Sequence, residues 1–235
     1  MIGGIIGDKL IDLLYPLRCV YCSEHLFSAE IPLCRKCYNK LKFVSKNVCE
    51  KCGRHIDEGE YVCELCKKKK IEIDFSRSCV YYDDISAAVI KRFKYSNKAD
   101  IGLFISSVMY DKFLTELNYT DIEYITYIPF GYFKEYNRFY NHSKILAENL
   151  SELTGVPVCG DIISQNIISV SQAKLPIFLR EKRPFMFCRG KKRIKAEKIL
   201  LIDDVLTTGR TISDASKAIK KYNDVKIVCA LTFAC

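Results

Sequence analysis

The clearest pattern of apolar and polar positions in the chain begins at residue 199. Ile199–Ile202 is a continuous apolar run, short enough for a strand covered on both faces, as in a parallel sheet flanked by helices. Two acids follow, and from Ser213 apolar residues recur at helical spacing. We therefore expect a central strand, a loop and a helix, with Asp203 and Asp204 at the carboxyl end of the strand, where open α/β sheets bind ligands.

Three further segments have the composition or periodicity of regular elements. Ile122–Ile128 is rich in residues that favour strands and ends before Pro129, and Asn141–Leu150 has the pattern of a helix. Near the N-terminus, Ile5–Tyr15 places four apolar residues on one helical face before Pro16 ends it. These four are Ile6, Leu10, Leu13 and Leu14. We expect this segment to be a docking helix, and a role at a membrane surface is the alternative.

The loop that follows the acid pair, Thr207–Thr211, has the composition of an anion site. It would present backbone N–H groups at a helix N-terminus, its threonine hydroxyls add short donors, and Gly209 would let the backbone approach a phosphate. The two acids would repel a phosphate, so a ligand that reaches both needs neutral donors, such as ribose hydroxyls, at its other end. We expect a phosphorylated sugar; the alternative is an ordinary strand, turn and helix with solvated acids.

Length and charge limit the number of domains and the kind of partner. With 235 residues, 49% of them hydrophobic, the chain has enough material for one α/β core and a small appendage. The formal charge is +9, and Lys and Arg outnumber acids by 11 to 5 in residues 35–70 and by 6 to 1 in residues 189–198. These clusters favour an anionic partner such as nucleic acid.

Neither a membrane span nor an export signal is evident in the sequence. No apolar run reaches the roughly 18 residues that a spanning helix needs, and no basic region precedes the first apolar stretch. We therefore expect a cytoplasmic protein without a transmembrane segment, whose contact with a membrane would run through partner proteins.

Eight of the thirteen cysteines form four C-x-x-C pairs, a spacing that brings two thiolates to one face of a tight turn. Two pairs supply the four-sulfur shell of a structural zinc, so four pairs predict two zinc ions. Each zinc contributes roughly 10 to 16 kcal/mol, which would replace the core that this lysine-rich region lacks. Neighbouring pairs are favoured over interleaved ones. Disulfides and redox-active pairs are the alternatives, and a reducing cytosol disfavours disulfides. The predicted ligands are Cys19, Cys22, Cys34, Cys37, Cys49, Cys52, Cys63 and Cys66.

The segment Ile199–Thr211 resembles the phosphoribosyl-pyrophosphate signature of the type I phosphoribosyltransferases. The resemblance implies that Asp203 and Asp204 bind the ribose hydroxyls and that Mg²⁺ accompanies the pyrophosphate. Arg210 stands where the signature usually has a small residue, so its side chain must point outward. The residues implied to hold the 5′-phosphate are Thr207, Thr208, Gly209, Arg210 and Thr211.

Zinc knuckles before such a domain resemble the ComF family, whose members act in DNA uptake during natural transformation. The stretch "LIDLLYPLRCVYC" is similar to the family's opening helix and first knuckle, and "IKRFKYSNKADIG" is similar to its lysine-aromatic segment, with Lys94 and Tyr95 in place. The resemblance implies an α/β fold: a parallel sheet flanked by helices, of the type I phosphoribosyltransferase kind, preceded by a small zinc-ribbon domain. We expect a docking helix at 1–17, a double zinc ribbon at 18–70 and the phosphoribosyltransferase-like domain at 71–235.

The stretch "ITYIPFGYFKEYNRFYNHSKILAENL" resembles the family's strand, pyrophosphate-side loop and helix, but its match is incomplete. Pro129, Phe130, Arg138 and Asn141 are the implied loop residues, with Arg138 and Lys94 as cations that stabilise the leaving pyrophosphate. Phe139 replaces a glycine, and Arg138 beside tyrosines could instead be a surface cation over an aromatic ring. His142 replaces a glutamine, and we interpret it as a solvated surface histidine.

The stretch "SVSQAKLPIFLREKRPFMF" resembles the family's Gln-x-x-Leu segment, which forms a mobile lid in related transferases. Gln172, Lys174, Arg180 and Arg183 are therefore candidates for phosphate or single-strand contacts, and solvated lid charges are the alternative. The function that the resemblance implies is binding of phosphoribosyl pyrophosphate and single-stranded DNA, together with proteins of the competence machinery. An active phosphoribosyltransferase of nucleotide metabolism is the alternative, and an interaction adaptor with an idle site is a weaker one.

Overall fold

The computed structural model describes residues 17–28, 30–44, 47–68, 71–95, 99–130, 140–165 and 186–235. The predicted docking helix therefore lies outside the described residues. So do four predicted site residues, Arg138, Gln172, Lys174 and Arg180, together with Arg183.

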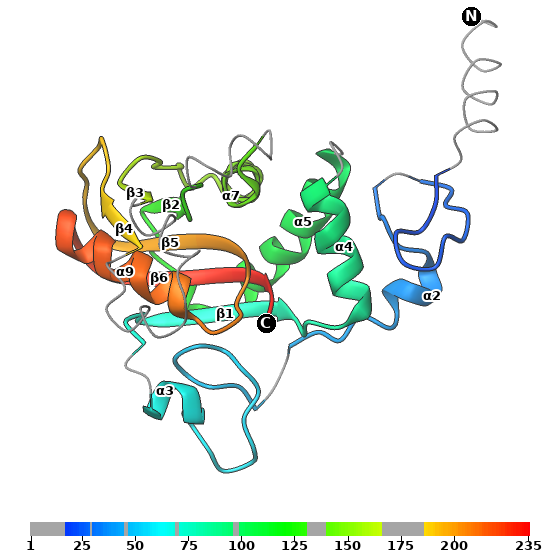
Figure 1. The fold of residues 1–235 in the computed structure, drawn as a ribbon, viewed down its shortest axis with the longest axis horizontal. Helices are drawn as coiled ribbons and strands as arrows, with labels where there is room; N and C mark the ends of the chain where they lie inside the picture. Colours follow the sequence, from blue (N-terminus) through cyan, green and yellow to red (C-terminus); the bar gives the residue numbers. More distant parts are fainter. Residues whose placement is uncertain are drawn as a thin grey trace, which may run out of the picture.

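A four-stranded parallel sheet organises the fold (Figure 1). Its strands lie in the order β1 (Phe75–Val80), β6 (Asp224–Ala234), β5 (Lys195–Val205) and β2 (Tyr124–Tyr127). Leu200 pairs with Cys229 on one side and with Ile125 on the other, so β5 is an interior strand, as its apolar run predicts. A separate antiparallel pair, β3 (Ile163–Gln165) and β4 (Phe187–Arg189), lies beside the sheet.

Helices cover both faces of the sheet, which confirms the expected α/β class. Leu200 and Ile202 belong to a core shared with α4 (Asp84–Tyr95), α5 (Ala99–Thr115) and α7 (His142–Thr154). Ile199 and Leu201 point the other way, into a core shared with α9 (Arg210–Tyr222). All four side chains are fully buried. The short 3-10 helix η1 (Leu117–Tyr119) precedes β2.

Several predicted elements were shorter than the observed ones. Strand β5 extends to Val205, so both acids lie within the strand's last three residues rather than after it. Helix α9 begins at Arg210, three residues before the apolar periodicity starts, and α7 extends to Thr154. Most of the additional residues are polar, so the apolar pattern did not indicate them.

The N-terminal cysteine-rich segments lie along the outer edge of β1. The backbone N–H of Val44 donates to Cys79 O at 2.9 Å, that of Tyr81 donates to Lys42 O at 2.8 Å, and that of Ser76 donates to Lys51 O at 2.8 Å. These bonds satisfy backbone groups that an edge strand would otherwise expose. The short helices α2 (Arg35–Tyr38) and α3 (Glu64–Lys68) belong to these segments.

The cysteine-rich segments also share the cores of the sheet, contrary to the expectation that zinc replaces a core there. Cys19, Cys34 and Cys37 are buried in the same cluster as α4 and α5, while Cys49 and Cys52 are buried in the cluster of α9. Apolar burial therefore stabilises these segments in addition to the metal.

Candidate functional site

The eight cysteines converge in two groups of four. Cys19, Cys22, Cys34 and Cys37 form the first group, and Cys49, Cys52, Cys63 and Cys66 form the second; within each group the sulfur atoms lie within 4.8 Å of one another. Neighbouring pairs thus share a site, as predicted. Four sulfurs at this spacing fit the tetrahedral shell of zinc, so the chain carries two structural zinc sites.

The two zinc sites are built alike. In the first, Ser23 N donates to Cys19 O at 3.0 Å, and in the second, Gly53 N donates to Cys49 O at 2.8 Å. Ser23 and Gly53 both have positive φ, at 63° and 72°. Burial raises the pKa of Cys49, but hydrogen bonds from backbone N–H groups outweigh it and lower the pKa to about 7. The same balance lowers the pKa of Cys19 to about 7, so both thiols are prepared to ligate as thiolates.

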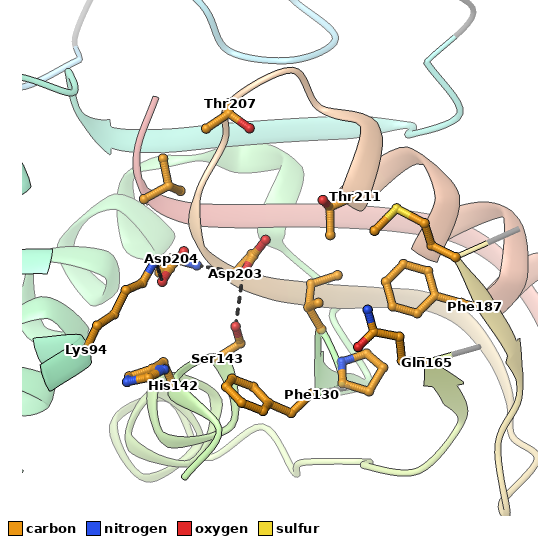
Figure 2. Close-up of a pocket in the computed structure, with 14 residues that line it drawn as sticks. Lys94, Phe130, His142, Ser143, Gln165, Phe187, Asp203, Asp204, Thr207 and Thr211 are labelled. Carbon is orange, nitrogen blue, oxygen red and sulfur yellow. Dashed lines mark hydrogen bonds and ion pairs between the residues drawn. The ribbon is translucent and has the colours of Figure 1, made fainter. Parts of the chain in front are cut away.

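A cavity of about 360 Å³ opens at the carboxyl ends of β5 and β2 (Figure 2). Seven of the predicted site residues line it, from four different parts of the chain. These are Lys94, Pro129, Phe130, Asp203, Asp204, Thr207 and Thr211. The sheet thus brings the acid pair, the threonine loop and the segment after β2 to one place, where ligands bind in open α/β sheets.

The acid pair is held by neighbours from two helices. Asp204 Oδ2 forms an ion pair with Lys94 Nζ of α4 at 2.5 Å, and both side chains are at most a quarter exposed. Asp203 Oδ1 accepts hydrogen bonds from Ser143 Oγ of α7 and from the backbone N–H of Asp204, both at 3.0 Å. Figure 2 shows Lys94 and Ser143 reaching the two carboxylates.

These contacts do not fully offset the cost of charging Asp203. Burial is the main cause that raises its pKa, and the adjacent Asp204 carboxylate also raises it; the bonds from Asp204 N and Ser143, and the charge of Lys94, act in the opposite direction, and the net result is a pKa of about 7. The Asp203 carboxyl therefore titrates near neutral pH.

The threonine loop leads directly into α9. Gly209 is the N-cap of α9 with φ 74°, a left-handed conformation that favours glycine. Arg210 is the first helical residue, and its side chain extends along the helix to Asp214, with Nε 3.6 Å from Oδ2. The side chain is half exposed, so its expected outward direction is confirmed. Thr207 and Thr211 line the cavity, whereas Thr208 accepts a hydrogen bond from Arg210 N at 3.4 Å.

Asn141 lies beside the first cavity and does not line it. It caps α7, where its side chain accepts from Lys144 N at 3.2 Å and donates to Ile128 O at 3.1 Å. It lines an adjoining cavity of about 430 Å³, which shares Pro129, Phe130 and Gln165 with the first. Asn141 thus fixes the start of α7 and so positions Ser143.

His142 is not the solvated residue that the sequence suggested. It is 3% exposed, and its ring lies 5.1 Å from that of Phe93 and 4.8 Å from that of Tyr140. The prediction was wrong because α4 packs against the start of α7 and its Phe93 covers His142. That contact depends on tertiary structure, which the local sequence does not show.

The cavity residues that the sequence reasoning missed include Ser143, Gln165 and Phe187. Ser143 follows the cap of α7, a position that the helix boundary could have indicated. Gln165 and Phe187 come from β3 and β4, two strands of three residues each that carry no clear periodicity.

Comparisons with known proteins agree with the zinc assignment. Residues 10–69 match the model of the double zinc ribbon domain. Competence protein F of Haemophilus influenzae is 26% identical over 88% of this chain and 92% of its own length. Competence protein ComFC of Bacillus subtilis is 26% identical over 98% of this chain and 96% of its own length.

The zinc-ribbon match and these two relatives together support assignment of the chain to the ComF family. The similarity to these two relatives extends across the zinc ribbons and the α/β sheet alike. Within the described residues of this ComF-family chain, no helix is long and apolar enough to cross a membrane.

The zinc assignment predicts a stepwise loss of metal. Cys49→Ser removes one ligand of the second site, so the purified chain should retain one zinc where the parent retains two, measured by elemental analysis. The matched control is Cys159→Ser, a partly buried thiol outside both groups, which should keep both zincs. Two tightly held zincs in the Cys49→Ser chain would contradict the assignment.

The raised pKa of Asp203 predicts a pH dependence of stability. Between the ordinary value of 3.8 and about 7, the folded state keeps a proton that the unfolded state releases, so stability falls as the pH rises through this window. Asp203→Asn removes this titration. Its free energy of unfolding should therefore fall less than that of the parent from about pH 6 to about pH 8.

Urea titrations at both pH values measure this difference, with Asp111→Asn, an exposed acid of α5, as the control. Equal pH dependence in the parent and in Asp203→Asn would show that the carboxyl of Asp203 does not titrate in that range.

Proposed function

We propose that this ComF-family chain binds phosphoribosyl pyrophosphate and single-stranded DNA and acts in DNA uptake during natural competence. The observation that carries the proposal is the single cavity that joins the acid pair of β5 to the threonine loop before α9. Its volume of about 360 Å³ falls in the roughly 300–1,000 Å³ range of small-molecule sites. The names of the two full-length relatives support the biological setting.

In this proposal the sugar phosphate spans the cavity. The backbone N–H groups of residues 207–211, at the positive end of the α9 dipole, hold the 5′-phosphate. Asp203 and Asp204 each use one oxygen for the contacts with Ser143 and Lys94, which leaves the second oxygen of each to accept from a ribose hydroxyl. Lys94 reduces the repulsion between the acid pair and the ligand's phosphates.

The pyrophosphate would lie toward Pro129 and Phe130, after β2. The carboxylate and hydroxyl oxygens of Asp203, Asp204 and Ser143 are hard donors of the kind that suits Mg²⁺, so the lining fits a magnesium ion carried in by the pyrophosphate. Such an ion would neutralise part of the phosphate charge. The chain's own residues orient the sugar and exclude water beneath it.

The basic turn between β4 and β5 supports a role for single-stranded DNA. Lys191, Lys192 and Arg193 are exposed there, and Lys191 lines the cavity that adjoins the sugar-phosphate site. Lysines beside aromatic and amide side chains are typical of surfaces that track a single strand. The DNA strand would therefore pass close to the cavity that binds the sugar phosphate.

The alternative is an active phosphoribosyltransferase of nucleotide metabolism. Gln165 and Phe187 favour it, because an amide and a ring on the wall opposite the acids are groups that a nucleobase acceptor would use. A product assay with phosphoribosyl pyrophosphate and each common nucleobase separates the two functions. Base-dependent release of pyrophosphate would favour the enzyme.

The acid pair generates the first prediction of this proposal. Asp203→Asn with Asp204→Asn should weaken binding of phosphoribosyl pyrophosphate at least about 100-fold in calorimetry, because hydrogen bonds to charged groups contribute about 1.5–3 kcal/mol each. Asp224→Asn, the same chemical change at the first residue of β6, should leave the affinity unchanged. Retained zinc content and circular dichroism would establish that the double variant is folded. Undiminished affinity in that folded variant would contradict the proposed site.

The basic turn generates the second prediction. Replacing Lys191, Lys192 and Arg193 with glutamine should weaken the binding of single-stranded DNA and reduce the salt dependence of log K by about 2, at roughly 0.7 per phosphate contact. Fluorescence anisotropy against salt concentration measures both. Replacing Lys217, Lys220 and Lys226 with glutamine removes the same charge elsewhere and should change the slope less. Equal effects of the two triple variants would mean that the turn is not the DNA-binding surface.

A further inference from the structure

A third cavity, of about 430 Å³, lies between the first zinc ribbon and α5. None of its lining residues lines the sugar-phosphate cavity. Six of them recur along α5 at intervals of three and four positions, from Asp100 to Asp111, and the ribbon supplies the opposite wall. Residues at this spacing form one stripe on a helix, so the cavity is a groove that runs along α5.

The floor of the groove is apolar and partly exposed. Phe104 and Val108 are buried beneath it, and the ring of Phe104 meets that of Tyr38 edge to face, with centroids 6.3 Å apart. Leu103 and Ile31 flank the floor and are 53% and 44% exposed. A single exposed aliphatic residue is ordinary, but two beside one concave apolar floor mark a surface that another apolar group can cover.

The rim of the groove is acidic. Glu30, Asp100 and Asp111 are exposed, no basic residue lines the groove, and among the described residues none of these three acids forms an ion pair. This contrasts with the net charge of +9 of the whole chain. Asp100 and Asp111 are eleven positions apart on α5, which corresponds to about 16 Å.

We propose that this groove binds an amphipathic helix of a partner protein, with aliphatic residues at i, i+3, i+4 and i+7 and a lysine or arginine at each end. Such a helix lays its apolar stripe over the floor and against the exposed Leu103 and Ile31, as helices do in apolar grooves. Its terminal cations lie beside Asp100 and Asp111. Charge thus sets the register of the partner along α5, while apolar burial supplies most of the affinity.

Two other occupants fit the charges less well. The chain's own residues 5–15 include Asp8 and Asp12 against the single cation Lys9, so they would bring acids to an acidic rim. A second copy of the chain, joined by a two-fold axis through this groove, would place the rim acids of each copy against the same acids of the other.

A synthetic 14-residue peptide tests the proposal. It has leucine at the four spaced positions, alanine and glutamine elsewhere, two lysines at each end and a fluorescent label. Its binding to the full-length, zinc-loaded chain is followed by fluorescence anisotropy. Asp100→Lys with Asp111→Lys should weaken binding at least tenfold, and a peptide with glutamates in place of the lysines should bind that variant better than it binds the parent. Asp57→Lys with Asp224→Lys makes the same change of charge elsewhere and should leave the affinity within about twofold.

The apolar floor is tested separately. Leu103→Ser should weaken the lysine peptide at least fivefold, whereas Leu153→Ser, at a leucine of α7 with similar exposure, should not. Affinity for phosphoribosyl pyrophosphate should stay unchanged in all these variants. Three results would each overturn the proposal: equal peptide binding by the parent and the Asp100→Lys, Asp111→Lys chain; displacement of the probe by a peptide of residues 1–16; or dimerisation in light scattering that Leu103→Ser abolishes.

Discussion

Two adjacent carboxylates at the end of a buried strand repel each other and lose part of their hydration, and the architecture of the site follows from that constraint. Lys94 of α4 neutralises Asp204, and Ser143 of α7 and the backbone of Asp204 stabilise Asp203. The compensation is incomplete, which is why the pKa of Asp203 rises to about 7. A ligand that donates hydroxyl hydrogens to both carboxylates would supply the missing interactions, so the unliganded site is prepared for such a ligand.

The zinc ribbons contribute to the same architecture through the sheet. The segments that join the cysteine pairs satisfy the outer edge of β1, and several ligand cysteines lie in the two apolar cores. Arg77 links the second ribbon to the sheet, since its Nη1 donates to Glu50 O at 3.2 Å and its Nε lies 3.5 Å from Oε1 of Glu116, the residue that follows α5. Loss of zinc would therefore expose an edge strand as well as unfold a ribbon. The cavity between the first ribbon and α5 exists only because the ribbon is packed there.

The parts of this structure that sequence could predict are those encoded by local pattern. The apolar run at Ile199 implies a strand buried on both faces, and C-x-x-C spacing implies a thiolate pair, because each depends on residues close together in the chain. Lys94 was expected beside the pyrophosphate, whereas in the structure it pairs with Asp204. The two residues are 110 positions apart, and only the packing of α4 against the sheet brings them together. The burial of His142 and the position of Phe187 in the cavity wall likewise depend on tertiary packing. Asp100 and Asp111 on the groove rim lie on one helical stripe of α5, but the ribbon that turns the stripe into a groove was visible only in three dimensions.

The central claim is that the amides after the acid pair hold the phosphate of a phosphorylated sugar. The most direct measurement is a titration of the ¹⁵N-labelled, zinc-loaded chain with ribose 5-phosphate, followed by the amide resonances. The account predicts saturable shifts that are largest at Thr207, Thr208, Gly209, Arg210 and Thr211, and no comparable shifts with unphosphorylated ribose. Equal shifts with the two sugars, or shifts confined to the basic turn at residues 189–195, would contradict it.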